Sequence, residues 1–200
     1  MKSPPPLILA STSRYRKELL ERLALTFTCV APGVDEAPLP GESAKALVAR
    51  LASAKATAVA SQYPEAWVIG CDQVAVRVDE AKKEWVLGKP KTAAHCEEQL
   101  QACSGRILSF LTAVAVMHEE SGALIEFIDT TRVLFRALDP AAIKRYVAKE
   151  QPLDCAGGFK SEGLGITLCE SIDSSDPSAL IGLPLMRLGA VLRDAGYELP

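Results

Sequence analysis

The chain has 200 residues, enough for a domain with a sizeable hydrophobic core, and its 48% hydrophobic and 24% charged residues are typical of a soluble globular protein. No apolar run approaches the ~20 residues that a membrane-spanning helix needs, so we expect no membrane partner. The formal net charge of −3 argues against a nucleic-acid partner, because it leaves no basic surplus to neutralise phosphates.

The first part of the chain alternates apolar runs with helical patterns. An apolar run over 7–10 predicts a strand, and leucines at helical spacing predict a helix over 13–24. Further strands are predicted at 27–31 and, from its β-branched density, at 66–78. Between these two strands, Ser43 predicts the N-cap of a long helix that ends near residue 62.

The middle of the chain contains a helix and a predicted hairpin. The helix covers 92–103 and is ended by a Ser-Gly pair. Two long strands, 106–118 and 123–138, flank the turn sequence EESG. Asp139 followed by Pro predicts the start of a helix that runs to about Lys149.

The last part of the chain begins with an unusually long connection over 151–165, rich in Gly and polar residues. Loops of that length are often functional. A last strand at 166–172 and a final helix over 178–195 complete the chain. The order of these elements predicts an α/β fold with a mixed sheet.

The cysteines and the N-terminal sequence both indicate the cellular compartment of the protein. The six cysteines are scattered without a C-x-x-C pair, and we interpret them as reduced, mostly buried side chains. The first apolar stretch is too short for a secretory signal. We therefore expect a cytoplasmic protein.

Lys55 does not fit a purely structural interpretation of its helix. It follows Leu51 by four residues, so its ammonium rises from the apolar face. Either the stem extends the charge to water, or the charge meets an anion, because a partly buried unpaired ammonium is costly. The apolar face is predicted to consist of Leu47, Leu51, Ala54, Ala58 and Val59.

Asp72 is the second unusual residue, since it interrupts the apolar strand sequence VIGCDQVAV. It could simply end the strand or cap a turn. A carboxylate at a strand end beside a glycine could also hold a divalent metal or orient water. The sequence leaves both interpretations open.

Two loops carry weaker signals. The sequence GKP presents the point charge of Lys89 on a stiff turn, although it is also a common surface turn. Asp35 and Glu36 in PGVDE could be solvated, or could help to hold a phosphate-bound Mg²⁺.

The segment LILASTSRYRK places hydroxyls and bases directly after the first strand. Ser11 and Arg16 could form an anion site at the start of the following helix, where free N–H groups favour anions. The alternative is a solvated first helical turn. Arg14 and Lys17 are predicted to be solvated, because at most one of them shares a helix face with Arg16.

Together these residues have the chemistry that metal-assisted attack on a polyphosphate requires. Lys and Arg side chains neutralise phosphate oxygens, and carboxylates hold the metal and accept a proton from water. Neither of the two histidines lies in a context that suggests a Ser-His-Asp arrangement. A covalent nucleophile is therefore not expected.

Stretches spread over nearly the whole chain resemble the Maf family of nucleotide pyrophosphatases. In order they are LILASTSRYRKELLERL, GVDE, ESAKALVARLASAKA, VIGCDQV, GKP, CSGR, YVAKEQPLDCAGGFKSEGLG and IGLPL. The resemblance implies cleavage of a nucleoside triphosphate between the α- and β-phosphates with Mg²⁺ or Mn²⁺, in a nucleotide-pool house-cleaning reaction. It also implies one Maf/ITPase-like domain over 1–200, with an elongated mixed β-sheet flanked by helices and a cleft between two lobes, and a possible homodimer.

The resemblance also assigns roles to residues of this chain. Asp72 matches the proton acceptor, and Glu36 matches a polar residue of the cleft. We expect Glu36 and Asp72 to hold the metal. The polar residues of the family's cleft are also matched by Ser11, Arg16, Lys55 and Lys89, which we expect to bind the phosphates.

Gln73 and Glu162 resemble the subgroup that acts on N7-methyl-GTP, whereas members acting on dTTP and UTP read GADT and GIQG at these places. A carboxylate such as Glu162 can accept both donors of a guanine edge, and an aromatic face such as Tyr15 attracts a cationic base. The subgroup commonly has Pro-Trp where this chain has Arg14-Tyr15. The alternatives are the same reaction on dTTP, UTP, CTP or another modified nucleotide, or a non-catalytic nucleotide-binding regulator linked to cell division.

Overall fold

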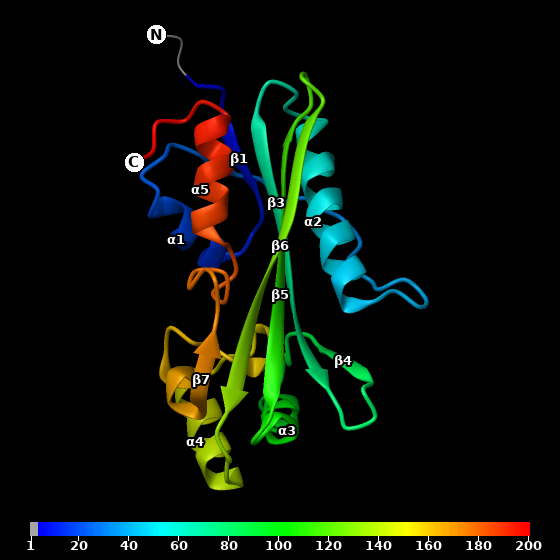
Figure 1. Ribbon diagram of the computed structural model, residues 1–200, viewed down its shortest axis with the longest axis vertical. Coiled ribbons are helices and arrows are strands. Elements are labelled where there is room, and N and C mark those ends of the chain that lie inside the picture. The colour runs from blue at the N-terminus through cyan, green and yellow to red at the C-terminus, as the bar shows by residue number, and fades with distance from the viewer. Residues whose placement is uncertain (1–3) are drawn as a thin grey trace. The chain divides into compact units, whose positions relative to one another are not determined.

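The computed structural model describes residues 4–200, which form two compact units (Figure 1). The first unit contains the residues up to Asp72, with Thr112–Asp129 and Asp176–Pro200. The second contains Gln73–Leu111 and Thr130–Ser175. Within residues 4–200, no helix combines the length and apolarity required to cross a membrane.

The helices alternate with strands along the chain, as the sequence predicts. Two short 3₁₀ helices, η1 (Ala156–Gly158) and η2 (Leu164–Leu168), lie in the long connection near the C-terminus. The α-helices are α1 (Arg14–Glu21), α2 (Ala44–Ala60), α3 (Ala93–Cys103), α4 (Pro140–Glu150) and α5 (Leu185–Asp194).

The strands form a mixed sheet in the order β2-β1-β3-β5-β6-β7, with β4 paired to β3. β1 pairs in parallel with β2 and β3, whereas β4 and β7 pair antiparallel with β3 and β6. The predicted α/β fold with a mixed sheet is therefore confirmed. The strands are β1 (Leu7–Ala10), β2 (Thr28–Cys29), β3 (Trp67–Val78), β4 (Glu84–Leu87), β5 (Ile107–His118), β6 (Ala123–Phe135) and β7 (Cys169–Asp173).

In the first unit, helices cover both faces of β1 and β3 (Figure 1). Successive side chains of a strand point to opposite faces, so Leu9 packs with the leucines of α1 and α5. Ile8 belongs to the opposite cluster, which includes Val59 of α2. Because both faces are covered, β1 is apolar throughout rather than alternating.

A glycine in β3 allows α2 to approach the sheet closely. A Cβ atom on Gly70 would lie 2.2 Å from the carbonyl oxygen of Ala52 and 2.5 Å from the backbone nitrogen of Ala56. These positions lie on the buried side of α2 together with Lys55. The small residues therefore bring the ammonium-bearing face of α2 against β3.

In the second unit, α3 and α4 pack together, and an aromatic cluster fills the interior. The ring centroid of Phe159 lies 5.8 Å from that of Phe110 and 5.2 Å from that of Phe135. Phe159 follows η1 directly, so the long Gly-rich connection is anchored in the core.

Several predicted boundaries are wrong. The first helix ends at Glu21 rather than near residue 24, and Ala24 has a positive φ of 53°. The predicted strand at 166–172 begins three residues too early, because residues 166–168 belong to η2 and β7 begins at Cys169. The short strand β4 was not predicted, because no element was assigned to residues 84–87.

The largest error concerns the final helix, which begins at Leu185 rather than at residue 178. The segment before it forms a turn organised by the buried carboxylate of Asp176. This carboxylate accepts hydrogen bonds from the backbone and hydroxyl of Ser178 and from the backbone N–H of Met186. Asp176 therefore provides the N-terminal capping of α5 from a distance.

Candidate active site

The ammonium group of Lys55 lies between two carboxylates of the first unit. Its Nζ is 2.7 Å from Oδ1 of Asp72 and 2.6 Å from Oε1 of Glu36. Lys55 is only 4% exposed. The interpretation in which its stem extends the charge to water is therefore wrong, and the charge is paired inside the protein.

Asp72 lies in the interior of β3 and is 7% exposed, so it neither ends the strand nor caps a turn. Without a partner, the ionised side chain of an acid on a buried strand would be an unpaired buried charge, which is costly. α2 supplies that partner, because Lys55 lies on its buried face. This close approach of α2 to β3 is what makes the pair possible.

The loop that carries Glu36 is fixed by a cation that sequence analysis missed. Arg50 of α2 donates from Nε and Nη2 to the two carboxylate oxygens of Glu42, at 2.7 and 2.8 Å. Its Nη2 also donates to the carbonyl oxygen of Ala37, at 3.0 Å. The hydrogen bonds from Arg50 lower the pKa of Glu42 to about 2. The side chain of Glu36 itself stays 62% exposed.

Ser11 and Ser13 organise the start of α1. The hydroxyl oxygen of Ser11 accepts a hydrogen bond from the backbone N–H of Ser13 at 3.1 Å. Ser13 is the N-cap, and its hydroxyl oxygen accepts from the backbone N–H of Arg16 at 3.4 Å. Ser11 is buried next to the first turn of α1.

Arg16 is held by the turn that precedes α5. Its Nε donates to the carbonyl oxygen of Gly182 at 3.2 Å, and the thiol of Cys71 donates to the same oxygen at 3.1 Å. Burial raises the pKa of the Cys71 thiol, although the nearby Arg16 guanidinium opposes this effect. Within residues 4–200, Arg16 forms no ion pair with a carboxylate, so its charge is available to an anion.

The two neighbouring bases behave differently from Arg16. Lys17 forms an exposed i,i+4 pair with Glu21 at 3.8 Å, which confirms that it is solvated. Arg14 is exposed but lies over the ring of Tyr15, with 4.7 Å from its guanidinium carbon to the ring centroid. Its Nη2 also donates to the Tyr15 hydroxyl at 2.6 Å.

The remaining predicted site residues belong to the second unit. Lys89 is exposed in the loop after β4, and Glu162 is exposed in the turn before η2. Gln73 follows Asp72 in β3 and is partly buried. The structure thus brings Lys55, Asp72 and Glu36 together. The convergence of Lys89, Gln73 and Glu162 on the same ligand stays a prediction.

Comparison with known proteins identifies the family of the chain. Residues 6–195 match the family model described as Maf-like protein. The chain belongs to the Maf family. The residues named above thus lie within the part of the chain that the Maf model covers.

Three Maf relatives are similar along almost their whole length, and each is named 7-methyl-GTP pyrophosphatase. The protein of Xanthomonas oryzae pv. oryzae (strain MAFF 311018) is 53% identical over 196 residues, which cover 98% of this chain and 100% of the relative. That of Alkalilimnicola ehrlichii is 52% identical, covering 98% and 96%. That of Pseudomonas fluorescens is 48% identical, covering 98% and 99%.

The carboxylates of this Maf chain fit a metal ion that also has ligands from the substrate. Within residues 4–200, no group of three or more His, Cys, Asp or Glu side chains could hold a metal ion. Asp72 and Glu36 supply carboxylate oxygens brought close by a shared ammonium. Mg²⁺ is often bound by one or two carboxylates plus substrate phosphates and water, so this pair fits a metal that arrives with a polyphosphate.

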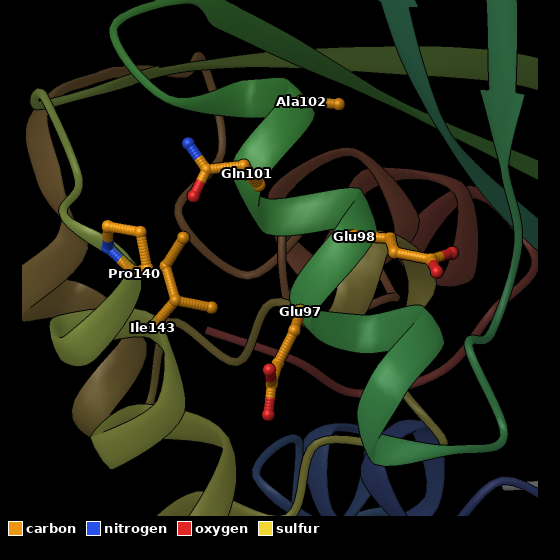
Figure 2. Close-up of a pocket in the computed structure, with 6 residues that line it drawn as sticks. All are labelled: Glu97, Glu98, Gln101, Ala102, Pro140 and Ile143. Carbon is orange, nitrogen blue, oxygen red and sulfur yellow. The ribbon is translucent and has the colours of Figure 1, made fainter.

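A pocket of about 500 Å³ lies elsewhere, between α3 and α4 of the second unit (Figure 2). No predicted site residue lines it. Its charged lining residues are acidic, so it would repel a triphosphate. The lining residues are Glu97, Glu98, Gln101, Ala102, Pro140 and Ile143.

Proposed function

We propose that this Maf protein is a nucleoside triphosphate pyrophosphatase that hydrolyses N7-methyl-GTP to m7GMP and pyrophosphate. The observation that carries the proposal is the buried Lys55 ammonium between Asp72 and Glu36. Relatives that are about half identical along their whole length carry the name of this activity. The reaction would remove a modified nucleotide from the nucleotide pool.

In the proposed mechanism, Asp72 accepts a proton from the water that attacks the α-phosphorus. Lys55 holds this carboxylate at 2.7 Å and fixes its direction. Since Lys55 lies at the junction of two acids, it also provides positive charge where phosphate oxygens meet the carboxylates. The bond between the α-phosphorus and the bridging oxygen breaks, and pyrophosphate leaves.

Arg16, Ser11 and Lys89 bind the phosphates in this proposal. Arg16 has one donor committed to Gly182 and carries no paired carboxylate within residues 4–200, so it can neutralise phosphate oxygens. Ser11 lies beside the first turn of α1, where the helix N-terminus favours anions. Lys89 would add a further point charge from its exposed loop.

Glu36 and Asp72 would hold Mg²⁺ or Mn²⁺ together with phosphate oxygens. When bound, the metal supplies Lewis-acid stabilisation of the charge on the phosphates. The exposed position of Glu36 allows it to exchange between the ammonium of Lys55 and such a ligand.

Base recognition is assigned to Glu162, Gln73 and Tyr15. Glu162 would accept hydrogen bonds from the N1–H and the 2-amino group of guanine, and Tyr15 would face the cationic methylated ring. The Arg14 cation already lies over the Tyr15 ring. This contact supports a second candidate, the same cleavage on unmodified or other modified nucleotides, because one cation on the ring disfavours another.

A panel of triphosphates with pyrophosphate detection tests the proposal. We expect N7-methyl-GTP to give the highest kcat/KM, with pyrophosphate as the released product and with dependence on Mg²⁺ or Mn²⁺. A higher kcat/KM on UTP, dTTP or CTP would show that this nucleotide, rather than N7-methyl-GTP, is the preferred substrate. Tight nucleotide binding without pyrophosphate release would instead favour a regulator. A homodimer and a cytoplasmic location stay predictions.

A further inference from the structure

The turn that carries Glu162 is closed by its own backbone. The N–H of Gly163 donates to the carbonyl oxygen of Lys160 at 3.3 Å, and Ser161 and Glu162 occupy the two central positions. The hydroxyl of Ser161 donates to Glu162 at 3.4 Å. Glu162 is therefore displayed at the tip of a tight turn, and its direction depends on how that turn is held.

Glu150, the last residue of α4, holds this turn from both sides. Its Oε1 is 2.8 Å from Nζ of Lys160, and its Oε2 accepts from the backbone N–H of Leu164 at 2.6 Å. Lys160 directly precedes the two central residues of the turn, and Leu164 directly follows its last residue, Gly163, so the two contacts lie on either side of Glu162. The side chain of Glu150 is only 11% exposed. The hydrogen bond from Lys160 lowers the pKa of Glu150, and the same contact raises the pKa of Lys160.

Two further features show that the contact is built into the fold. A Cβ atom on Gly163 would lie 2.4 Å from Oε2 of Glu150, so a larger residue there would displace the carboxylate from its position. One helical turn earlier in α4, the hydroxyl oxygen of Tyr146 accepts from the backbone N–H of Lys160 at 3.0 Å. The same face of α4 therefore fixes the turn at two points.

Glu150 is poorly placed to stabilise its own helix. A negative charge at a helix C-terminus opposes the helix dipole. The carboxylate instead contacts Lys160 and Leu164 in the segment beyond the helix. Its position is explained by the turn that it holds.

We propose that Glu150 is a positioning residue for Glu162 in the recognition of the guanine edge. The inference rests on the proposed function, in which Glu162 accepts hydrogen bonds from N1–H and the 2-amino group. An exposed carboxylate can accept two parallel donors only if its backbone is fixed, because every free rotor weakens a bidentate contact. Glu150 supplies that fixation through Lys160 and Leu164.

GTP and ITP test this inference directly, since they differ only in the 2-amino group. We expect the full-length protein to prefer GTP over ITP by about 10- to 100-fold in kcat/KM, the range for a hydrogen bond to a charged group. Glu162→Gln should remove most of this preference. Glu150→Gln and Gly163→Ala should lower the ratio at least about fivefold, mainly by lowering kcat/KM for GTP.

The control is Glu170→Gln, which changes an exposed acid of β7 and should leave the ratio unchanged. A merely structural role for Glu150 would lower the rates for GTP and ITP in parallel. That result, or a wild-type protein that does not distinguish the two nucleotides, would overturn the inference.

Dissociation constants for GMP and IMP, measured by calorimetry with the same variants, separate this inference from the proposed function. The expected GMP preference and its loss in Glu150→Gln would support the positioning role even if no triphosphate were hydrolysed. Absence of turnover would then contradict only the proposed function. Equal binding of GMP and IMP by the wild-type protein would contradict the role of the turn.

Discussion

The two units present their predicted site residues in different ways. In the first unit, Lys55 and Asp72 are buried and bind each other directly. In the second unit, Lys89 and Glu162 are exposed on loops. There the backbone, rather than the charged side chain, is fixed.

Buried anchors fix those loops. The carbonyl oxygen of Gly88, next to Lys89, accepts from the backbone N–H of Gly157 and from Nε2 of Gln99. The turn of Glu162 is held by Glu150. The buried charges of Lys55 and Asp72 are thus paired with each other, whereas the exposed charges of Lys89 and Glu162 lie on loops whose backbones are held by buried groups. Substitutions in the two units should therefore have different consequences for stability.

The largest expected effect is the loss of stability in Lys55→Met. This change leaves the buried Asp72 carboxylate without the ammonium, and breaking a buried pair costs about 3–5 kcal/mol. Urea unfolding measures the difference in free energy. Lys89→Met is the matched control, because Lys89 is exposed and forms no ion pair with residues 4–200, so its loss should change stability by less than about 0.5 kcal/mol. Equal effects of the two substitutions would break the comparison.

Asp72→Asn should lower kcat by about 10²-fold or more, because an amide cannot accept the proton from water. Pyrophosphate release under saturating substrate measures this loss. Glu36 still pairs with Lys55 in this variant, so the fold should persist. Turnover near the wild-type rate would remove Asp72 from the role of base.

Gly70→Ala should destabilise the first unit by about 1–3 kcal/mol, the usual cost of overpacking. The added methyl group would contact the backbone of α2 at Ala52 and Ala56, and so would push Lys55 away from Asp72. Gly88→Ala is the control in the second unit, because among residues 4–200 nothing beyond Gly88 and its two chain neighbours lies within 4 Å of the added Cβ. The free energies of unfolding of both variants measure the difference. A Gly70→Ala protein as stable as the Gly88→Ala protein would contradict the close approach of α2 to β3.

The smallest expected effect concerns pH and Glu42. Arg50 lowers the pKa of Glu42 from 4.5 to about 2, so the folded state favours the ionised acid. The resulting stabilisation is fully present above about pH 4.5 and is lost as the pH falls toward about 2. The difference in unfolding free energy between wild type and Glu42→Gln should shrink over this window. A difference that stays constant with pH would exclude a contribution from this pair.

The sequence identified Lys55 and Asp72 as unusual charges but not Arg50 or Glu150, for a physical reason. A charge on an apolar helix face or strand, such as Lys55 or Asp72, requires a partner, and helical or strand periodicity exposes that requirement. Arg50 and Glu150 gave no such signal, because they lie where charged residues are ordinary. Their function comes from contacts with Ala37 and Leu164, which no sequence pattern specifies.

Element types followed from periodicity, but boundaries depended on tertiary contacts. Ser43 was correctly predicted as the N-cap of α2, since a local hydroxyl caps the helix. The start of α5 was missed because Asp176 caps it from ten residues upstream of Met186. A capping group so distant in sequence leaves no local signature.

The central claim is that the Lys55–Asp72 pair directs water to the α-phosphorus. Hydrolysis of N7-methyl-GTP in oxygen-18 water tests this claim most directly. The account predicts unlabelled pyrophosphate and m7GMP with one labelled oxygen, formed by the wild-type protein and at least about 10²-fold more slowly by Asp72→Asn. Orthophosphate as the product, or label in the pyrophosphate, would contradict it.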